Sequence, residues 1–343
     1  MYSEKKLDSS SVKIGVVGCG IMAERHLNAY LKMDGVKVVA VCDINFELAK
    51  YIGGKYRAIP YQNYEDLIKD ENINAIDVCV PTILHHNVVL NALENNKHVF
   101  CEKPLTNKLE YVEQIKEKII ERKKILMTGY LYNFHPSFKR LKLILKEKTI
   151  GDPYFAIFRI GGRGSRQIWK HKKDSGGGAL LEMMVHMLDL ASSYFYPFKE
   201  VQTIHYDTIL KRRFIESKEI EANAEDCVYL RLRSEKDVEI ICEADLITPS
   251  YMNYVEVHGD NGSFFGSILD YFPTMIYCKE PKGVYNQGVN LFPNPRVDLI
   301  QEELEHFTKV LQGLTEPTDF INKELQIFKI IEEIRRQAGI DVY

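Results

Sequence analysis

The sequence predicts an α/β protein in which a doubly wound parallel sheet is followed by an α+β domain with an open, mostly antiparallel sheet. Over the first 130 residues, short apolar runs alternate with amphipathic stretches, which is the pattern of β-α repeats. After residue 136, alternating apolar and polar strands are joined by short turns, which is typical of hairpins. A chain of 343 residues with 45% hydrophobic residues is long enough for two such domains, expected at residues 1–130 and 131–343.

The parallel sheet is predicted from short runs rich in valine and isoleucine. Continuous apolar runs suit strands that are covered on both faces. These runs occupy residues 12–17, 36–41, 75–80, 98–101 and 125–127. Helices are expected at residues 21–33, 46–53, 64–69, 85–95 and 107–122, with Thr106 or Asn107 as the N-cap of the last one.

The second domain begins with a basic helix that ends near Lys148 and a Gly151-Asp152-Pro153 turn. Two hairpins are then expected from paired strands on either side of turn residues. The strands are placed at residues 228–233, 238–244, 254–258 and 263–268. Two amphipathic helices are expected at 297–312 and 322–338, at the end of the chain, and they can pack back on the first domain.

Composition excludes several classes of protein. The formal net charge of -3 comes from residues of both signs spread along the chain, so no basic field is available to bind nucleic acid or a membrane surface. The first eleven residues are polar and the first apolar run is too short to cross a membrane, so we expect a cytoplasmic protein. The seven cysteines lack the paired spacing of a zinc site, and we expect buried thiols rather than redox chemistry.

A glycine-rich turn follows the first predicted strand. Gly18, Gly20 and Ala23, with Ile21 and Met22 between them, fit the pattern G-x-G-x-x-A at the start of a helix. Gly18 permits a tight turn, Gly20 lets the backbone approach a pyrophosphate, and small Ala23 allows the helix to pack closely on the strand. The pattern predicts a dinucleotide-binding Rossmann domain.

Asp43 ends the second predicted strand and bears on the choice of coenzyme. A carboxylate there accepts hydrogen bonds from the adenosine ribose and repels a 2′-phosphate. The next two residues, Ile44 and Asn45, offer no arginine to hold such a phosphate. The sequence therefore predicts NAD rather than NADP, the alternative being an aspartate that only caps the following helix.

Glu102-Lys103-Pro104 follows the strand at 98–101. Charged residues at the carboxyl end of a buried parallel strand lie where ligands bind in open α/β sheets. The proline restricts the backbone of the residue before it, so Lys103 is held on a stiff segment. The alternative is a strand end that merely faces solvent.

A helix that is otherwise apolar carries Glu182, His186, Asp189 and Ser193 at spacings that place them on one face. A buried polar row is costly unless its members satisfy one another or meet a ligand, so these residues are functional candidates. A structural core histidine is the alternative. A zinc pair formed by Glu182 and His186 lacks a third ligand, and no metal site is predicted.

Together with Pro81-Thr82-x-x-His85 and with Gly176-Gly177-Gly178 before that helix, these motifs resemble the Gfo/Idh/MocA family of NAD(P)-dependent sugar oxidoreductases, which includes glucose-fructose oxidoreductase and inositol dehydrogenase. Five separated motifs occur in the family's order. The resemblance implies a Rossmann domain followed by an α+β domain whose open sheet forms homodimer or homotetramer contacts. It also implies that the nicotinamide is held in a cleft between the two domains.

The resemblance implies roles for individual residues. His186 would take the proton of the substrate hydroxyl as hydride leaves, and Lys103 would stabilise the developing alkoxide. Glu182, where most relatives have aspartate, would orient His186 or bind a neighbouring hydroxyl. Cofactor contacts are implied for Pro81, Thr82, His85, Glu102 and Lys103, although His85 is equally a polar residue at a helix start.

The substrate is expected to contact a basic loop at residues 163–173. Arg163, Arg166 and Trp169 suit a sugar that bears phosphate or carboxylate groups, because guanidinium groups bind oxyanions and the indole offers an aromatic surface. The alternative is a solvated basic loop. Further candidates for sugar contacts are Tyr130, Tyr132, Asn133, His135, Asn286, Gln287 and Asn290.

We therefore expect an NAD-dependent enzyme that acts on a CH-OH group of a sugar, with a nucleotide sugar or acidic sugar of surface-polysaccharide biosynthesis as the first candidate. Two alternatives remain. One is a cyclitol, aldose or dihydrodiol dehydrogenase of the same fold. The other is a non-catalytic regulator that binds a dinucleotide, which the presence of Lys103 and His186 disfavours.

Overall fold

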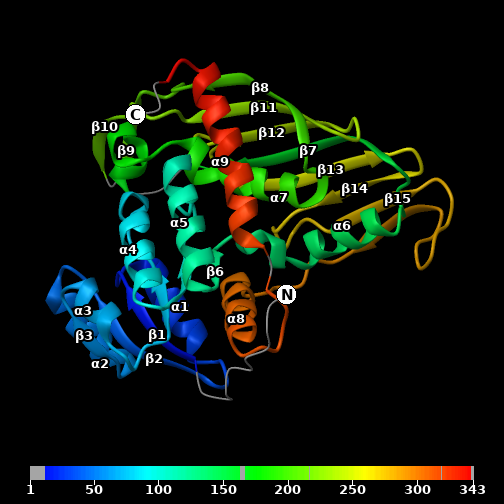
Figure 1. Cartoon of the computed structure of the whole chain (residues 1–343). Coiled ribbons are helices and arrows are strands. Elements are labelled where there is room, and N and C mark those ends of the chain that lie inside the picture. Colours follow the sequence, from blue (N-terminus) through cyan, green and yellow to red (C-terminus); the bar gives the residue numbers. More distant parts are fainter. Residues whose placement is uncertain (1–11, 163–166, 216, 318, 341–343) are drawn as a thin grey trace. The chain divides into compact units, whose positions relative to one another are not determined.

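The computed structural model describes residues 12–162, 167–215, 217–317 and 319–340 (Figure 1). The chain divides into two compact units. The first unit holds the described residues up to Leu131 and those from Asp298 to Leu325. The second holds the described residues from Tyr132 to Val297 and those from Gln326 on.

The first unit is built on a six-stranded sheet in the order β3-β2-β1-β4-β5-β6, and every neighbouring pair is parallel. The strands are β1 (Val12–Val17), β2 (Val36–Cys42), β3 (Ile59–Tyr61), β4 (Ala75–Val78), β5 (His98–Cys101) and β6 (Leu126–Thr128). The predicted doubly wound parallel sheet is confirmed. Only β3 was not predicted, because it has three residues and a proline at its centre. The strand order reverses between β1 and β4, which is where such sheets bind ligands.

Six helices are assigned wholly to the first unit: α1 (Ile21–Tyr30), α2 (Phe46–Tyr56), α3 (Tyr64–Lys69), α4 (Thr82–Glu94), α5 (Leu109–Arg122) and α8 (Leu299–Leu311). The predicted N-cap of α5 is wrong. The N-cap is Lys108, without a side-chain hydrogen bond, because the Thr106 hydroxyl donates instead to the carbonyl of Lys108 at 2.9 Å. Helix α8 contributes buried Ile300, Leu304 and Phe307, and the Phe307 ring meets the ring of Phe100 edge-on at 5.6 Å.

The second unit contains an eight-stranded sheet in the order β16-β15-β14-β13-β7-β12-β11-β8. Strands β7 and β12 pair in parallel and all other neighbours are antiparallel, so the predicted mostly antiparallel sheet is confirmed. The strands are β7 (Pro153–Gly161), β8 (Phe198–Asp207), β11 (Cys227–Ser234), β12 (Glu239–Asp245), β13 (Met252–Gly259), β14 (Gly262–Gly266), β15 (Thr274–Cys278) and β16 (Gly288–Phe292). A separate hairpin joins β9 (Arg212–Ile215) to β10 (Lys218–Glu221).

Helices lie along the large sheet of the second unit (Figure 1). They are α6 (Pro136–Lys146), α7 (Val185–Phe195) and the part of α9 (Phe320–Gln337) from Gln326 on. Strand β13 alternates buried and half-buried residues, as expected when one face of a sheet is packed. The amide of Gln337 ties the end of α9 to β8, because it accepts from Thr203 N at 2.7 Å and donates to Val201 O at 2.8 Å.

Short helical turns complete the described elements: η1 (Leu131–Phe134), η2 (Ile168–His171), η3 (Lys173–Ser175) and the π turn η4 (Leu180–Met184) that leads into α7. Among the described helices, none combines the length and the apolar character that a membrane crossing requires.

Candidate active site

The glycine turn after β1 fits a dinucleotide pyrophosphate. Gly18 has a φ of +96°, and a Cβ there would lie 2.5 Å from the carbonyl oxygen of Cys79, so only glycine suits the position. A Cβ at Gly20 would meet nothing within 4 Å, which leaves open space above the start of α1. Gly20 is also the N-cap of α1 and makes no side-chain hydrogen bond there. The amide groups at the N-terminus of α1 can therefore face an anionic ligand.

The three residues after Gly20 differ in their exposure to solvent. Ala23 is fully buried and lets α1 pack closely on the sheet, whereas Ile21 is exposed and Met22 is half-buried at the mouth of the turn.

Asp43 ties the end of β2 to the glycine turn. One carboxylate oxygen accepts from Cys19 N at 2.9 Å, and the other accepts from Asn45 N at 2.8 Å. A carboxylate has about four lone-pair sites, so acceptor capacity for ribose hydroxyls remains. The alternative in which Asp43 caps α2 is wrong, because Asn45 is the N-cap and its side chain accepts from Leu48 N at 3.3 Å.

His85 lies buried on α4 and bridges two backbone segments. Its Nδ1 is 2.8 Å from the Pro104 carbonyl oxygen, and its Nε2 is 2.8 Å from the Val80 carbonyl oxygen. Burial lowers the pKa of His85, while its contacts with Val80 and Pro104 oppose that shift. The ring thus links the segments that follow β4 and β5. Of the two other candidates here, Pro81 is exposed and Thr82 is buried.

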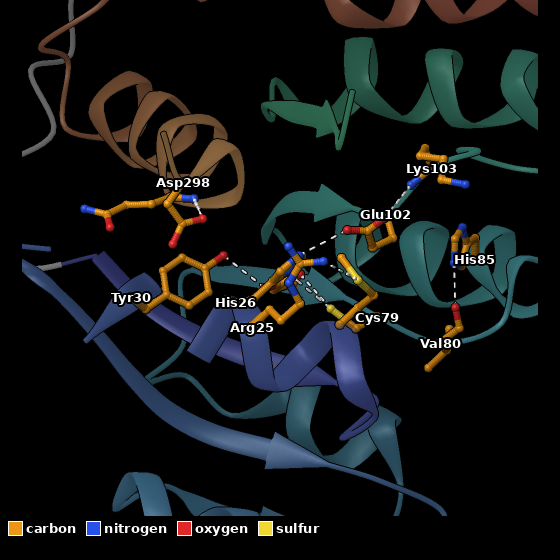
Figure 2. A network of polar contacts seen from close by, with 12 residues as sticks. Arg25, His26, Tyr30, Cys79, Val80, His85, Glu102, Lys103 and Asp298 are labelled. Carbon is orange, nitrogen blue, oxygen red and sulfur yellow. Dashed lines mark hydrogen bonds and ion pairs between the residues drawn. The ribbon is translucent and has the colours of Figure 1, made fainter. Parts of the chain in front are cut away.

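Glu102 joins Lys103 to the interior of the first unit (Figure 2). Its Oε2 accepts from the backbone N–H of Lys103 at 3.2 Å, and its Oε1 lies 3.1 Å from Nε2 of His26. The Glu102 side chain is 13% exposed and the Lys103 residue is half-buried at the end of β5. Burial would raise the pKa of Glu102, but the hydrogen bond and charge of His26 lower it below its ordinary value.

The helix that carries His186 starts with a π turn, which places Glu182 differently from the uniform α-helix assumed for the polar stripe. The Glu182 carboxylate lies 2.6 Å from the ammonium of Lys170. The buried His186 ring packs against the Tyr132 ring, with centroids 4.5 Å apart. Near-continuous apolar sequence on this helix contains no signal for a π turn, so the altered position of Glu182 could not be predicted.

Asn133 connects the other two members of the stripe. Its side-chain NH₂ donates to the Asp189 carboxylate, and its carbonyl oxygen accepts from the Ser193 hydroxyl at 3.2 Å. Ser193 also contacts the Asp189 carbonyl oxygen at 2.9 Å. Asp189 and Ser193 therefore belong to a network that anchors η1 to α7 through Asn133.

Part of the basic loop is engaged by the second unit itself. Lys170 contacts Glu182, Lys172 donates to the Glu221 carbonyl at 2.5 Å, and buried His171 contacts the Arg213 guanidinium at 2.6 Å. Trp169 is half-buried. Arg163 and Arg166 lie outside the described residues.

The remaining candidates make contacts within their own unit. The hydroxyl of buried Tyr130 donates to Glu324 at 3.4 Å, and the hydroxyl of Tyr132 pairs with that of Tyr251. His135 is the N-cap of α6, and Asn290 donates to the Asn286 carbonyl at 2.8 Å. All seven cysteines are free thiols and six of them are buried, as predicted.

The sequence analysis did not identify a buried cluster of ionisable side chains in the first unit. It contains His26 on α1, Asp77 on β4 and Glu303 on α8, each with no exposed surface, together with Glu102. Figure 2 shows the contact between His26 and Glu102. A signal was present in each case, because Asp77 interrupts an apolar strand and both His26 and Glu303 lie on the apolar face of a helix.

Comparisons with known proteins identify both domains. Residues 12–130 match the oxidoreductase family with an NAD-binding Rossmann fold, Gfo/Idh/MocA, and residues 138–265 match the C-terminal domain of the same family. Myo-inositol 2-dehydrogenase of Thermotoga maritima is 27% identical over 87% of either chain. The dTDP-3,4-didehydro-2,6-dideoxy-alpha-D-glucose 3-reductase of Actinomadura kijaniata is 28% identical over 56% of this chain and 58% of its own.

Several curated relatives, the Actinomadura reductase among them, match over little more than half of their own length. Among solved structures, levoglucosan dehydrogenase in complex with NADH and levoglucosan aligns with a TM-score of 0.86 and 20% identity, over 96% of this chain and 97% of that one. At that identity the likeness establishes the fold. The two domain matches and the agreement of both sheets show that the chain belongs to the Gfo/Idh/MocA family of oxidoreductases, whose first domain is an NAD-binding Rossmann fold.

Proposed function

We propose that this protein is an NAD-dependent oxidoreductase that transfers hydride between nicotinamide and a secondary hydroxyl or ketone of a sugar. One observation carries the proposal. The glycine turn after β1, Asp43 after β2 and Lys103 after β5 all lie at the carboxyl edge of one parallel sheet. That edge, beside the reversal of strand order, is where such sheets bind dinucleotides.

The proposed chemistry assigns one task to each of two side chains. Bound nicotinamide supplies the hydride acceptor for oxidation and the hydride donor for reduction. During oxidation the His186 imidazole takes the hydroxyl proton, and the Lys103 ammonium stabilises the negative charge that develops on the oxygen. In reduction the same proton returns from His186 to the carbonyl oxygen.

For the substrate we propose a polyhydroxy compound of the sugar or cyclitol class. The Lys170 and Glu182 pair supports this proposal, because its two opposite charges offer donors and acceptors to hydroxyl groups without a net positive field. A nucleotide-linked or acidic sugar is the second candidate. It is favoured by the likeness to a dTDP-sugar reductase and by the basic composition of residues 163–173.

The test is NAD reduction by the purified protein with a panel of sugars, cyclitols and nucleotide sugars, alongside Lys103→Met and His186→Asn. We expect each substitution to retain NADH binding in a fluorescence titration and to lower kcat by about 10²-fold or more, the usual effect of removing an acid-base group. Loss of NADH affinity in His186→Asn would exclude its role as a substrate-side base. Unchanged turnover in Lys103→Met would remove that lysine from the mechanism.

A thermal-shift screen of the NAD-loaded protein separates the two substrate candidates, since a ligand that binds the folded state raises Tm. Larger shifts with nucleotide sugars than with free sugars or myo-inositol would favour the second candidate. Equal or smaller shifts would favour the first.

A further inference from the structure

His26 lies between the carboxyl groups of Asp77 and Glu102 inside the first unit, and Figure 2 shows its contact with Glu102. Its Nδ1 is 2.9 Å from Oδ2 of Asp77, and its Nε2 is 3.1 Å from Oε1 of Glu102. A neutral imidazole carries only one N–H, so only the doubly protonated ring donates to both carboxylates. Two carboxyl groups at hydrogen-bond distance, one at each ring nitrogen, therefore favour the imidazolium form of His26.

Glu303 brings a third carboxyl group to this place from α8. The residue has no exposed surface, and neither of its carboxyl oxygens has a hydrogen-bond partner among the described residues. One ligand atom each from His26, Glu102 and Glu303 lies within 4.8 Å of the others. An ionised carboxylate without partners would be very costly there. Burial and the negative charge of Glu102 accordingly raise the pKa of Glu303 well above its ordinary value.

The charge of the cluster also depends on the other groups that face it. Burial alone would lower the pKa of His26, but Cys79 and Asp77 raise it well above its ordinary value. The phenol of Tyr30 and the thiol of Cys79 both donate to Asp77, at 3.0 and 3.3 Å, and burial raises the pKa of each, so both are neutral. The remaining facing groups are Arg25 on α1, His85 on α4, and Cys101 and Lys103 at the end of β5.

The arrangement that these contacts favour is one imidazolium, two carboxylates and one neutral acid. Glu102 connects it to the proposed active site, because one of its oxygens faces His26 while the other accepts from the Lys103 amide at 3.2 Å. Any change in the charge or position of Glu102 therefore acts directly on the backbone of Lys103.

We propose that His26, Asp77 and Glu303 are positioning residues for Lys103. Together they hold the Glu102 carboxylate in one place. Glu303 is a neutral acid in this arrangement and so adds no further negative charge beside Glu102. The part of this inference that concerns turnover rests on the proposed function. The protonation state of His26 does not.

The first readout is independent of activity: ¹⁵N NMR of the histidine side chains, with the His26 signal assigned by its absence in His26→Gln. We expect both ring nitrogens of His26 to remain protonated throughout the neutral pH range. Glu102→Gln should shift the titration of His26 to lower pH, because a charged partner is lost. A His26 ring that is neutral at pH 7 would overturn the proposal, whether or not the protein oxidises sugars.

The second readout is a double-mutant cycle in kcat. His26→Gln and Glu102→Gln should each lower kcat about tenfold, with KM for NAD little changed. The kcat of the double variant should be no lower than that of the worse single variant, because both changes act on Lys103 by the same route. Multiplicative losses would mean that His26 does not act through Glu102. Absence of any turnover in the wild-type protein would count against the proposed function. The NMR result would then decide alone whether His26 is protonated on both ring nitrogens.

Glu303→Gln tests the neutral acid, and Glu305→Gln is its matched control. Glu305 lies on the same helix but pairs with Lys309 at 3.0 Å on the surface. Because Gln cannot ionise, Glu303→Gln should keep its activity at alkaline pH where the wild type declines, and Glu305→Gln should keep the wild-type profile. Identical profiles in all three proteins would overturn the role of Glu303. Stoichiometric divalent metal that disappears in His26→Gln and Glu303→Gln would instead make the cluster a metal site.

Discussion

Asp43 has a structural role and a proposed role in coenzyme binding, so substitutions of Asp43 test the choice between NAD and NADP. Its carboxylate holds the amides of Cys19 and Asn45 and also lies where the adenosine ribose is expected. We expect Asp43→Asn to narrow the preference for NAD over NADP, because the amide removes the charge that repels a 2′-phosphate and keeps one acceptor oxygen. The measurement is the ratio of kcat/KM for the two coenzymes.

Asp43→Ala is the companion variant. It removes both backbone hydrogen bonds as well as the charge, so we expect it to narrow the ratio and also to lower Tm. A ratio unchanged in both variants would mean that Asp43 is not the ribose ligand. A lower Tm with an unchanged ratio would leave Asp43 with the structural role only.

The sequence could indicate candidate residues that stand in short motifs, but it could not indicate residues that meet across the fold. Gly18, Asp43 and Lys103 each stand at a strand end within a short motif, so the pattern identified them. Glu303 reaches His26 only because the chain returns to the first unit after the whole large sheet has been built. Sequence shows Glu303 as a charged residue on an apolar helix face, but it does not show which residue it meets.

Among the elements, the strands of the parallel sheet were predicted well because valine-rich runs are local signals. Helix starts were predicted less well. Helix α4 begins at Thr82 rather than at residue 85, with Pro81 as its N-cap. The start of the His186 helix depends on a distant residue, since Glu225 accepts from Leu180 N at 2.9 Å and thereby satisfies an amide at the helix N-terminus.

The Glu225 contact leads to a prediction about stability and pH. Gly178 must be glycine here, because its φ is +120° and a Cβ would lie 2.3 Å from Oε1 of Glu225. Burial raises the pKa of Glu225, against the opposing effects of Leu180 N and the Tyr206 hydroxyl. A raised carboxyl pKa means that the folded state favours the neutral acid. Its contribution to stability is therefore complete at low pH and is lost as the pH rises above the ordinary value of 4.5.

Glu225→Gln removes this loss, since glutamine stays neutral and keeps an oxygen for Leu180 N. We expect the free energy of unfolding of Glu225→Gln relative to wild type to increase between about pH 4.5 and pH 7. Glu225→Ala should be less stable than wild type by about 1–3 kcal/mol, because a buried amide loses its acceptor. Exposed Glu219→Gln on β10 is the control and should show no pH-dependent difference. A constant offset between Glu225→Gln and wild type would show that Glu225 titrates alike in both states.

At the scale of the whole molecule, the first unit depends on a segment that follows the second unit's sheet in the sequence. Helix α8 buries Ile300, Leu304 and Phe307 in the first unit. Burial of each such side chain contributes about 1.5–3 kcal/mol, so the three together are comparable with the net stability of a domain, about 5–15 kcal/mol. We therefore expect residues 1–131 alone to lack a cooperative thermal transition and measurable NADH binding.

Addition of a synthetic peptide of residues 298–325 should restore both properties to residues 1–131, with a transition temperature that rises with peptide concentration, since the peptide binds only the folded form. A peptide with Phe307→Ala should need a higher concentration, because it leaves the edge of the Phe100 ring without its aromatic contact. Cooperative unfolding and full NADH affinity in residues 1–131 without peptide would show that the Rossmann sheet and its first five helices suffice. Glu303 would then be an addition to an already stable domain rather than part of the packing that creates it.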